Sequence, residues 1–489
     1  MKKTTITVKA VLLIAILSIC LTSCKKEEKK VDEVKTEAAK EEGLATYKKG
    51  GVAPCLSKAS WFPHTQTPAP AEGKGSPFDV SSTTNCIFHQ WSWQKFLWVT
   101  KPEGDLPLFL HQKEIIQVND AMEPVTQREG VSVVLTDTIQ AGSKHGVLKV
   151  NPEYNSETGK AFTVHYSIHT SLTMQDAAED FKEALASGKL PADNLETFPV
   201  GSLELKVSWV DAAAIPNNKL GNYYTTMAAV IDKDGKTYTN TKMALLGMHV
   251  VGVVENHPEF IWATFEHDDM VPNYDWKANT ASSATQKLLF AEGSTSGLDG
   301  ITFIKDKEPV LANKAYDLFQ YGVPVTVSGY METSQSEPEN FDHIKEINAS
   351  VAANLEGVWK NYFYNGSIWI DTDGMTPEQQ AQKIVELGNN IGSATPGSSA
   401  RGSLNCANVT METFTQTFQS DISDINVNNL ANCFSCHNPS SFSGNTSPIY
   451  LSHIFDKFIQ INDGKSDKEV ELMKDEQHQK MAEFLRTMK

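Results

Sequence analysis

Runs of alternating or β-branched residues between positions 131 and 327 constrain the fold of this 489-residue chain more than any other feature. Residues 202–210 alternate between apolar and polar side chains, which is typical of a strand with one face in a core and the other in solvent. Similar signals predict strands at residues 131–136, 146–150 and 161–171. Helical patterns occur as well, so we expect an α+β fold with a β-rich N-terminal domain.

Two hairpins are expected within this region. Residues 223–231 and 237–243 flank a turn sequence at 232–235, and residues 245–254 and 260–267 are joined by a short loop. If Val254 pairs with Phe260, then His249 and His267 lie diagonally on one face of the second hairpin.

These histidines form the candidate metal or substrate site of the large domain. His165 and His169 also share a face of their own strand, and imidazoles on inward-facing strands can bind a transition metal. The alternative is that they are hydrogen-bonded structural residues, which is more common for isolated histidines. The region has no nucleophile elbow, phosphate-binding loop, dinucleotide fingerprint or zinc-protease helix. No catalytic residue or substrate is therefore assigned.

Helical patterns frame the strand-rich region. Residues 86–100 predict a helix that stops before Pro102, and its three tryptophans are better explained as core residues than as a ligand platform. Residues 376–387 begin with good helix-start signals. The Gly/Asn/Ser/Pro-rich stretch at 388–403 is the best domain boundary.

The most specific motif is Cys433-Phe434-Ser435-Cys436-His437, a C-x-x-C-H pattern. Two thiols on one helical turn can reach the two vinyl groups of one porphyrin and form thioethers. The histidine follows at once, so its imidazole can ligate the iron from one face of the ring. The motif therefore predicts one covalently bound haem c.

Three other interpretations of the motif were weighed. A redox-active C-x-x-C is expected in a βαβ setting, whereas these flanks are Asn/Ser-rich and no strand precedes them. A zinc site needs further Cys or His at regular spacing, and Cys406, His453 and His478 are irregularly placed. A disulfide across two intervening residues is strained.

Residues 401–489 resemble the c-type cytochromes in this motif and in a helical layout, with helices expected at 410–420, 450–460 and 469–488. The resemblance implies a small all-α domain, thioethers at Cys433 and Cys436, iron ligation by His437 and one-electron transfer. We expect His453 as the second axial ligand, because it follows a polar loop and opens a helix. An open site remains an alternative, as do the methionines Met411, Met473 and Met481.

The N-terminus carries an export signal. Lys2 and Lys3 precede a short apolar run that ends in Leu21-Thr22-Ser23-Cys24, a tetrapeptide that resembles the lipobox of bacterial lipoproteins. This resemblance implies that the Cys24 thiol carries lipid and anchors the mature chain to a bilayer. We expect localisation to the cell envelope, on the periplasmic or the surface face of the outer membrane.

Four segments are expected from these patterns. Residues 1–23 are a signal peptide, 24–51 a charged flexible tether, 52–400 the β-rich α+β domain and 401–489 the haem domain. The formal net charge of −17 argues against nucleic acid as a partner and favours a basic redox protein.

Three cysteines remain after lipidation and haem attachment. Cys55, Cys86 and Cys406 are an odd set in an exported chain, so one disulfide is expected. Cys55–Cys86 is preferred, although Cys406 can replace either partner.

Three functions follow from the sequence. An electron carrier is favoured over an oxidoreductase with a site at His249 and His267. The third is a binding lipoprotein whose C-x-x-C-H holds zinc or a labile disulfide.

Overall fold

The computed structural model describes residues 53–138, 147–271, 284–292, 340–388, 399–403, 406–412 and 432–487, with short strand segments at 274–275, 280–281, 302–305 and 308–311. Cys55–Lys489 belongs to one compact unit. The signal peptide, Cys24 and the tether lie outside the described residues. Within these ranges, no helix combines the length and the apolar character needed to cross a bilayer.

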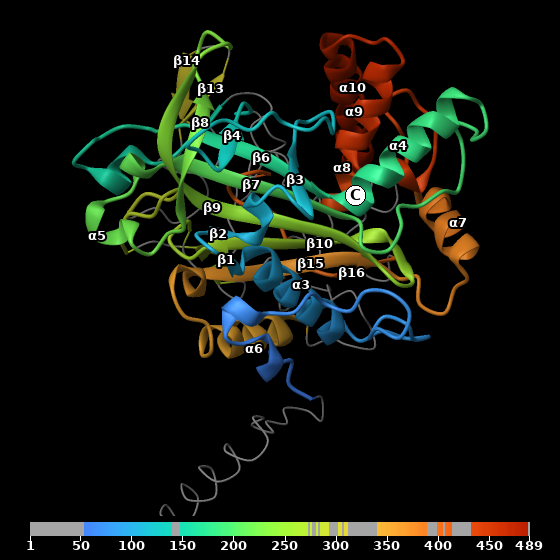
Figure 1. Ribbon diagram of the computed structural model, residues 1–489, viewed down its shortest axis with the longest axis horizontal. Coiled ribbons are helices and arrows are strands. Elements are labelled where there is room, and N and C mark those ends of the chain that lie inside the picture. Colours follow the sequence, from blue (N-terminus) through green and yellow to red (C-terminus); the bar gives the residue numbers. More distant parts are fainter. Residues whose placement is uncertain are drawn as a thin grey trace, which may run out of the picture. The chain divides into compact units, whose positions relative to one another are not determined.

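A nine-stranded sheet forms the centre of this unit (Figure 1). Its main path runs in the order β16 (Ala400–Gly402), β15 (Tyr362–Ile370), β10 (His257–His267), β9 (Tyr238–Val254), β7 (Leu203–Asp211), β6 (Val164–Ser171) and β3 (Ile115–Val118). β8 (Thr225–Ile231) pairs with β9, and β4 (Val133–Leu135) pairs with β8 in parallel. All other pairs in the sheet are antiparallel.

Short strands form smaller sheets beside it. β1 (Pro102–Glu103) pairs with β2 (Leu106–Pro107), and β11 (Tyr274–Asp275) pairs with β12 (Thr280–Ala281). A three-stranded sheet contains β14 (Glu308–Leu311), β13 (Thr302–Lys305) and β5 (Val147–Lys149). The strand expected at 146–150 therefore exists, but it does not belong to the central sheet.

Helices cover both faces of the central sheet (Figure 1). On one face, α3 (Asn85–Thr100) packs against α6 (Asn340–Ala352), β9 and β15. On the other face lie α4 (Leu172–Ala186), the 3-10 helix η10 (Pro448–Leu451) and α9 (His453–Asn462), which share one hydrophobic cluster with the sheet. The remaining helices are α5 (Asn217–Leu220), α7 (Pro377–Leu387), α8 (Cys433–Cys436) and α10 (Asp467–Thr487).

Two helix predictions are confirmed with their physical reasons. α3 spans the expected residues and buries Trp91 and Trp93, so the core interpretation of its tryptophans holds. α7 begins with a capping box in which the Thr376 and Gln379 side chains each bond the other's backbone N–H. Pro377 at the first helical position needs no hydrogen-bond donor.

The prediction that residues 202–210 form a strand with one solvent face was wrong in its burial. β7 does form there, but Glu204 and Ser208, which were expected to face solvent, are buried as well. The reason is that helices and loops cover the second face, which the local alternation of side chains does not reveal. The polar residues of that face are available for a buried polar network.

The C-terminal part of the chain is not shown as a separate all-α domain. The mixed helix-and-sheet class with a large antiparallel sheet is confirmed. However, β16 pairs with β15 at the expected boundary, so the chain is still in the central sheet at residue 402. Phe434, Ile454 and Phe455 are buried in the same cluster as sheet residues.

Candidate functional site

The C-x-x-C-H motif forms a single helical turn. In α8 the backbone N–H of Phe434 donates to the side chain of Asn432, which starts the turn. The N–H of His437 donates to the carbonyl of Cys433 at 2.8 Å, which continues it. Both thiols therefore lie on one turn with the imidazole directly after them, and the Cys433 side chain is buried while Cys436 is half-buried.

His437 is oriented by a backbone carbonyl. Its Nδ1 lies 2.8 Å from the carbonyl oxygen of Leu451, which can only accept, so Nδ1 carries the proton. The lone pair of this tautomer is on Nε2. Histidines that ligate metals almost always donate their other ring N–H to a carbonyl or carboxylate in this way.

Aromatic rings pack against the His437 imidazole from β10 and from α9. The Trp262 ring centroid lies 4.3 Å from that of His437, and the His453 ring stacks on it at 4.0 Å with 22° between the planes. His453 Nε2 is 2.9 Å from the Cys436 carbonyl, to which it donates. His453 therefore packs on the expected iron ligand, and its role as the second axial ligand stays a prediction.

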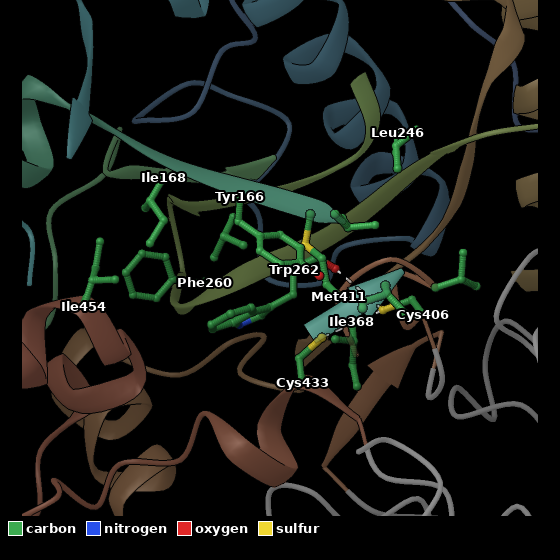
Figure 2. Close-up of a cluster of buried hydrophobic side chains, with 14 of the residues drawn as sticks. Tyr166, Ile168, Leu246, Phe260, Trp262, Ile368, Cys406, Met411, Cys433 and Ile454 are labelled. Carbon is green, nitrogen blue, oxygen red and sulfur yellow. Dashed lines mark hydrogen bonds between the residues drawn. The ribbon is translucent and has the colours of Figure 1, made fainter. Parts of the chain in front are cut away.

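A third cysteine, Cys406, lies beside the motif (Figure 2). The Sγ atoms of Cys406 and Cys433 are 4.0 Å apart, and both side chains are buried. The hydrogen bond with Cys406 and burial raise the pKa of the Cys433 thiol well above its usual value. From the sequence, Cys406 is a possible disulfide partner of Cys55 or Cys86 and an irregularly placed zinc candidate; no local pattern links it to Cys433, 27 positions away.

The methionine candidates for iron ligation differ in their positions. Met411 is buried in the same hydrophobic cluster as Cys406 and Cys433, on the segment that follows Cys406 (Figure 2). Met473 is half-buried on α10. Met481 lies in the part of α10 whose side chains are outside the described residues.

His249 belongs to a buried polar network that reaches the Cys406 segment. Its Nε2 lies 2.9 Å from both carboxylate oxygens of Glu412, and its Nδ1 lies 2.9 Å from Thr264 Oγ1. The Thr264 hydroxyl also donates to the carbonyl oxygen of Cys406. The network therefore ties the sheet face to the loop that carries the third thiol.

Glu266 lies on the same sheet face as His249 and Thr264 and is fully buried. One carboxylate oxygen accepts from the Val409 N–H at 2.7 Å, and the other has no hydrogen-bond partner among the described residues. Burial raises the pKa of Glu266 from 4.5 to about 8, and the nearby charge of Glu412 adds to the shift. Glu266 is therefore mainly protonated near neutral pH.

The expectation that His249 and His267 are diagonal neighbours on one face of the hairpin is wrong. The hairpin between β9 and β10 has an irregularity between His257 and Ile261, and His249 pairs with Thr264 instead of Phe265. Because side chains alternate between faces, this one-residue difference moves His267 to the opposite face of the sheet.

The other three histidines also lie away from His249. His267 stacks on Tyr223 at 3.6 Å and bonds the Asn222 carbonyl. His165 and His169 pair with Trp209 and Leu205, residues that pack in the α3-side cluster. The four histidines therefore do not converge on one site.

Cys55 and Cys86 are joined by a disulfide with a Cα–Cα distance of 5.4 Å, the pairing preferred from the sequence. The bond ties the start of the described chain to the N-terminal end of α3. Cys406, Cys433 and Cys436 are the cysteines that the described residues leave outside a disulfide.

The donor set at the motif fits a covalently held porphyrin. Two thiols share one turn, the adjacent imidazole has its Nδ1 held by a carbonyl, and the surroundings are apolar and aromatic. Among the residues that the structure describes, no group of three or more His, Cys, Asp or Glu side chains is arranged to hold a bare metal ion.

Comparisons of the chain with models of protein families, with curated proteins and with solved structures gave no match.

Proposed function

We propose that this chain is an exported, lipid-anchored c-type cytochrome that carries one haem on Cys433 and Cys436 and transfers single electrons. The observation that carries the proposal is the hydrogen bond between His437 Nδ1 and the Leu451 carbonyl. His437 directly follows the helical turn that bears the two thiols. That bond gives His437 the tautomer and the fixed orientation that an iron ligand needs.

The bound haem supplies an iron that exchanges one electron between its ferrous and ferric states. The chain's residues set the conditions for this exchange. Thioethers at Cys433 and Cys436 keep the group in place, and the Leu451 carbonyl makes the His437 imidazole a stronger donor through Nε2. The buried side chains of Phe434 and Trp262 keep water away, which disfavours the more highly charged ferric state and raises the reduction potential.

Anchoring and partner choice follow from the rest of the sequence. A lipidated Cys24 followed by a charged tether holds the protein at the cell envelope. The net charge of −17 steers a basic redox partner toward it and repels nucleic acid. The rate of electron transfer with such a partner should therefore fall as the ionic strength rises, because salt screens the attraction.

A second candidate function is an oxidoreductase with acid–base chemistry at His249. The observation that favours it is the His249–Glu412 pair beside the buried Glu266. His267 takes no part in this version, since it lies on the other face. His249→Gln and Glu412→Gln variants should then lose turnover while keeping the haem spectrum.

The test is production of the full chain in a host that attaches haem c to exported proteins. We expect sharp α and β absorbance bands on reduction, and a haem stain that survives a denaturing gel. The double variant Cys433→Ser/Cys436→Ser should lose the stain, whereas the matched variant Cys406→Ser should keep it. A colourless wild-type protein refutes the proposal, and one equivalent of zinc in that protein supports the binding-lipoprotein alternative.

A further inference from the structure

Cys406 and Cys433 form a pair of thiols that the electron-transfer proposal does not use. Their Sγ atoms are 4.0 Å apart, and the two side chains are 1% and 7% exposed. The pair lies in the cluster between the central sheet and the C-terminal helices (Figure 2). An exported chain meets oxidants of thiols, so two adjacent thiols in this chain are candidates for a disulfide.

The segment that carries Cys406 is attached to the sheet by several hydrogen bonds. The Cys406 carbonyl accepts from the Thr264 hydroxyl, and the Val409 N–H donates to Glu266 at 2.7 Å. The side chain of Asn408 donates to the Phe265 carbonyl at 3.2 Å. These contacts hold the Cys406 thiol next to α8, so the proximity of the two sulfurs is built into the fold.

We propose that Cys406 is the disulfide partner of Cys433 whenever Cys433 carries no thioether, so that oxidation closes the motif to porphyrin and reduction opens it. The disulfide rests on the export that is part of the function proposed above, but not on haem attachment. The control of haem attachment rests in addition on Cys433 being a thioether site.

The chemistry is a thiol–disulfide exchange with an exported disulfide-bonded oxidant. The two thiols lose two protons and two electrons to form one S–S bond, and the oxidant's disulfide takes them up as a dithiol. The Sγ–Sγ distance must shorten from 4.0 Å to roughly 2.05 Å. An exported dithiol reductant reverses the reaction and returns both thiols.

The alternative pairing lies within the motif, between Cys433 and Cys436 on one turn of helix. The bond to Cys406 instead joins two segments whose sulfurs are already 4.0 Å apart. Burial and the Cys406 contact also raise the pKa of the Cys433 thiol, so it reacts slowly once folded. Both oxidation and reduction of the pair therefore take place while the segment is accessible to the exchange partner.

Peptide mapping of the exported full chain tests the disulfide. The protein is made in a host without haem c attachment, alkylated and digested without reduction. Trypsin alone leaves all three cysteines on one peptide, because no Lys or Arg occurs between Arg401 and Lys457. Cleavage before Asp421 and Asp424 separates Cys406 from the motif, and chymotrypsin cleavage after Phe434 separates Cys433 from Cys436. We expect Cys406 and Cys433 to be crosslinked and Cys436 to be alkylated. A Cys433–Cys436 crosslink, or three alkylated cysteines, overturns the proposal.

Haem yield tests the control of attachment. In a host that attaches haem c, Cys406→Ser and Cys406→Ala should both raise the ratio of haem absorbance to protein above the wild-type ratio. Val409→Ala disturbs packing in the same segment without removing a thiol and should not raise it. An unchanged ratio in a coloured protein refutes the control role. A colourless protein refutes the haem itself, while the peptide map still decides the disulfide.

Discussion

The imidazole rings of His437 and His453 stack with their centroids 4.0 Å apart and their planes 22° apart. This relationship gives His453 a supporting role at the motif, since its Nε2 also donates to the carbonyl of Cys436. It packs on the proposed iron ligand and bonds the turn that holds the thiols. The following experiments use this arrangement and the polar network beside it.

Replacing His453 separates a stacking role from ligation. His453→Phe keeps a ring on His437 but removes the hydrogen bond to Cys436, so we expect an unchanged low-spin haem spectrum and a loss of about 1 kcal/mol in the free energy of unfolding. Absorbance spectroscopy and denaturant titration measure the two effects. A change to a high-spin spectrum would identify His453 as an axial ligand. His453→Ala, which also removes the ring, should destabilise more.

Gly247 lies where the sheet packs against Asn408 of the Cys406 segment. A Cβ at this position would lie 2.5 Å from Asn408 Nδ2 and 3.0 Å from the carbonyl oxygen of Phe265. Gly247→Ala should therefore displace the Asn408 side chain and lower the free energy of unfolding by about 1–3 kcal/mol. Gly221→Ala is the matched control, because nothing lies within 4 Å of its added Cβ. Equal unfolding midpoints for the two variants would contradict the packing described here.

The buried carboxyl of Glu266 makes stability depend on pH. Its pKa is about 8 in the folded protein against 4.5 for the free group, because burial disfavours the charge. The folded state thus holds a proton that the unfolded state releases. The resulting stabilisation is complete below pH 4.5 and is lost as the pH rises toward 8.

Glu266→Gln removes this dependence while keeping an oxygen for the Val409 N–H. The wild type should lose stability relative to the variant by up to about 1.4 kcal/mol per pH unit between those values. Denaturant unfolding of both proteins at pH 5, 7 and 9 gives the difference between their free energies of unfolding. The contributions of the other titrating groups cancel in this difference. A difference that stays constant with pH would show that Glu266 has an ordinary pKa.

The Cys55–Cys86 disulfide closes a loop with a sequence separation of 31. The double variant Cys55→Ser/Cys86→Ser should lose about 3–4 kcal/mol of stability through the greater entropy of its unfolded chain. Thermal or denaturant unfolding measures the loss. The haem spectrum should not change, because the bond lies beside α3 on the other face of the sheet from the motif. A loss below 1 kcal/mol would mean that the bond constrains the unfolded chain little.

Features set by neighbouring residues could be predicted from the sequence. The turn of helix at the motif, the helix beginning near Asn85 and the capping box at Thr376 all depend on contacts within a few positions. The hairpin between β8 and β9 is similar, since its turn at 232–235 and its pairing of Ile231 with Tyr238 are local.

Register and burial needed the tertiary structure. The irregularity after His257 decides that His249 meets Thr264 and that His267 faces the other way, and no residue pattern in the hairpin reveals it. From the sequence, Glu266 is one of several acidic residues near the candidate histidines and Glu412 carries no signal, because a carboxylate has the same sequence context whether buried or exposed.

By itself the sequence determined the chemistry that is available, two thiols and an imidazole on one turn near the C-terminus, and it predicts an export signal at the other end. Only the tertiary structure decided which groups stand beside that turn. It brought Cys406, Trp262 and the Leu451 carbonyl to the motif from distant positions. The physical reason is that a turn of helix is specified by bonds between near neighbours, whereas contacts between a loop, a strand and a helix depend on how all three are packed together.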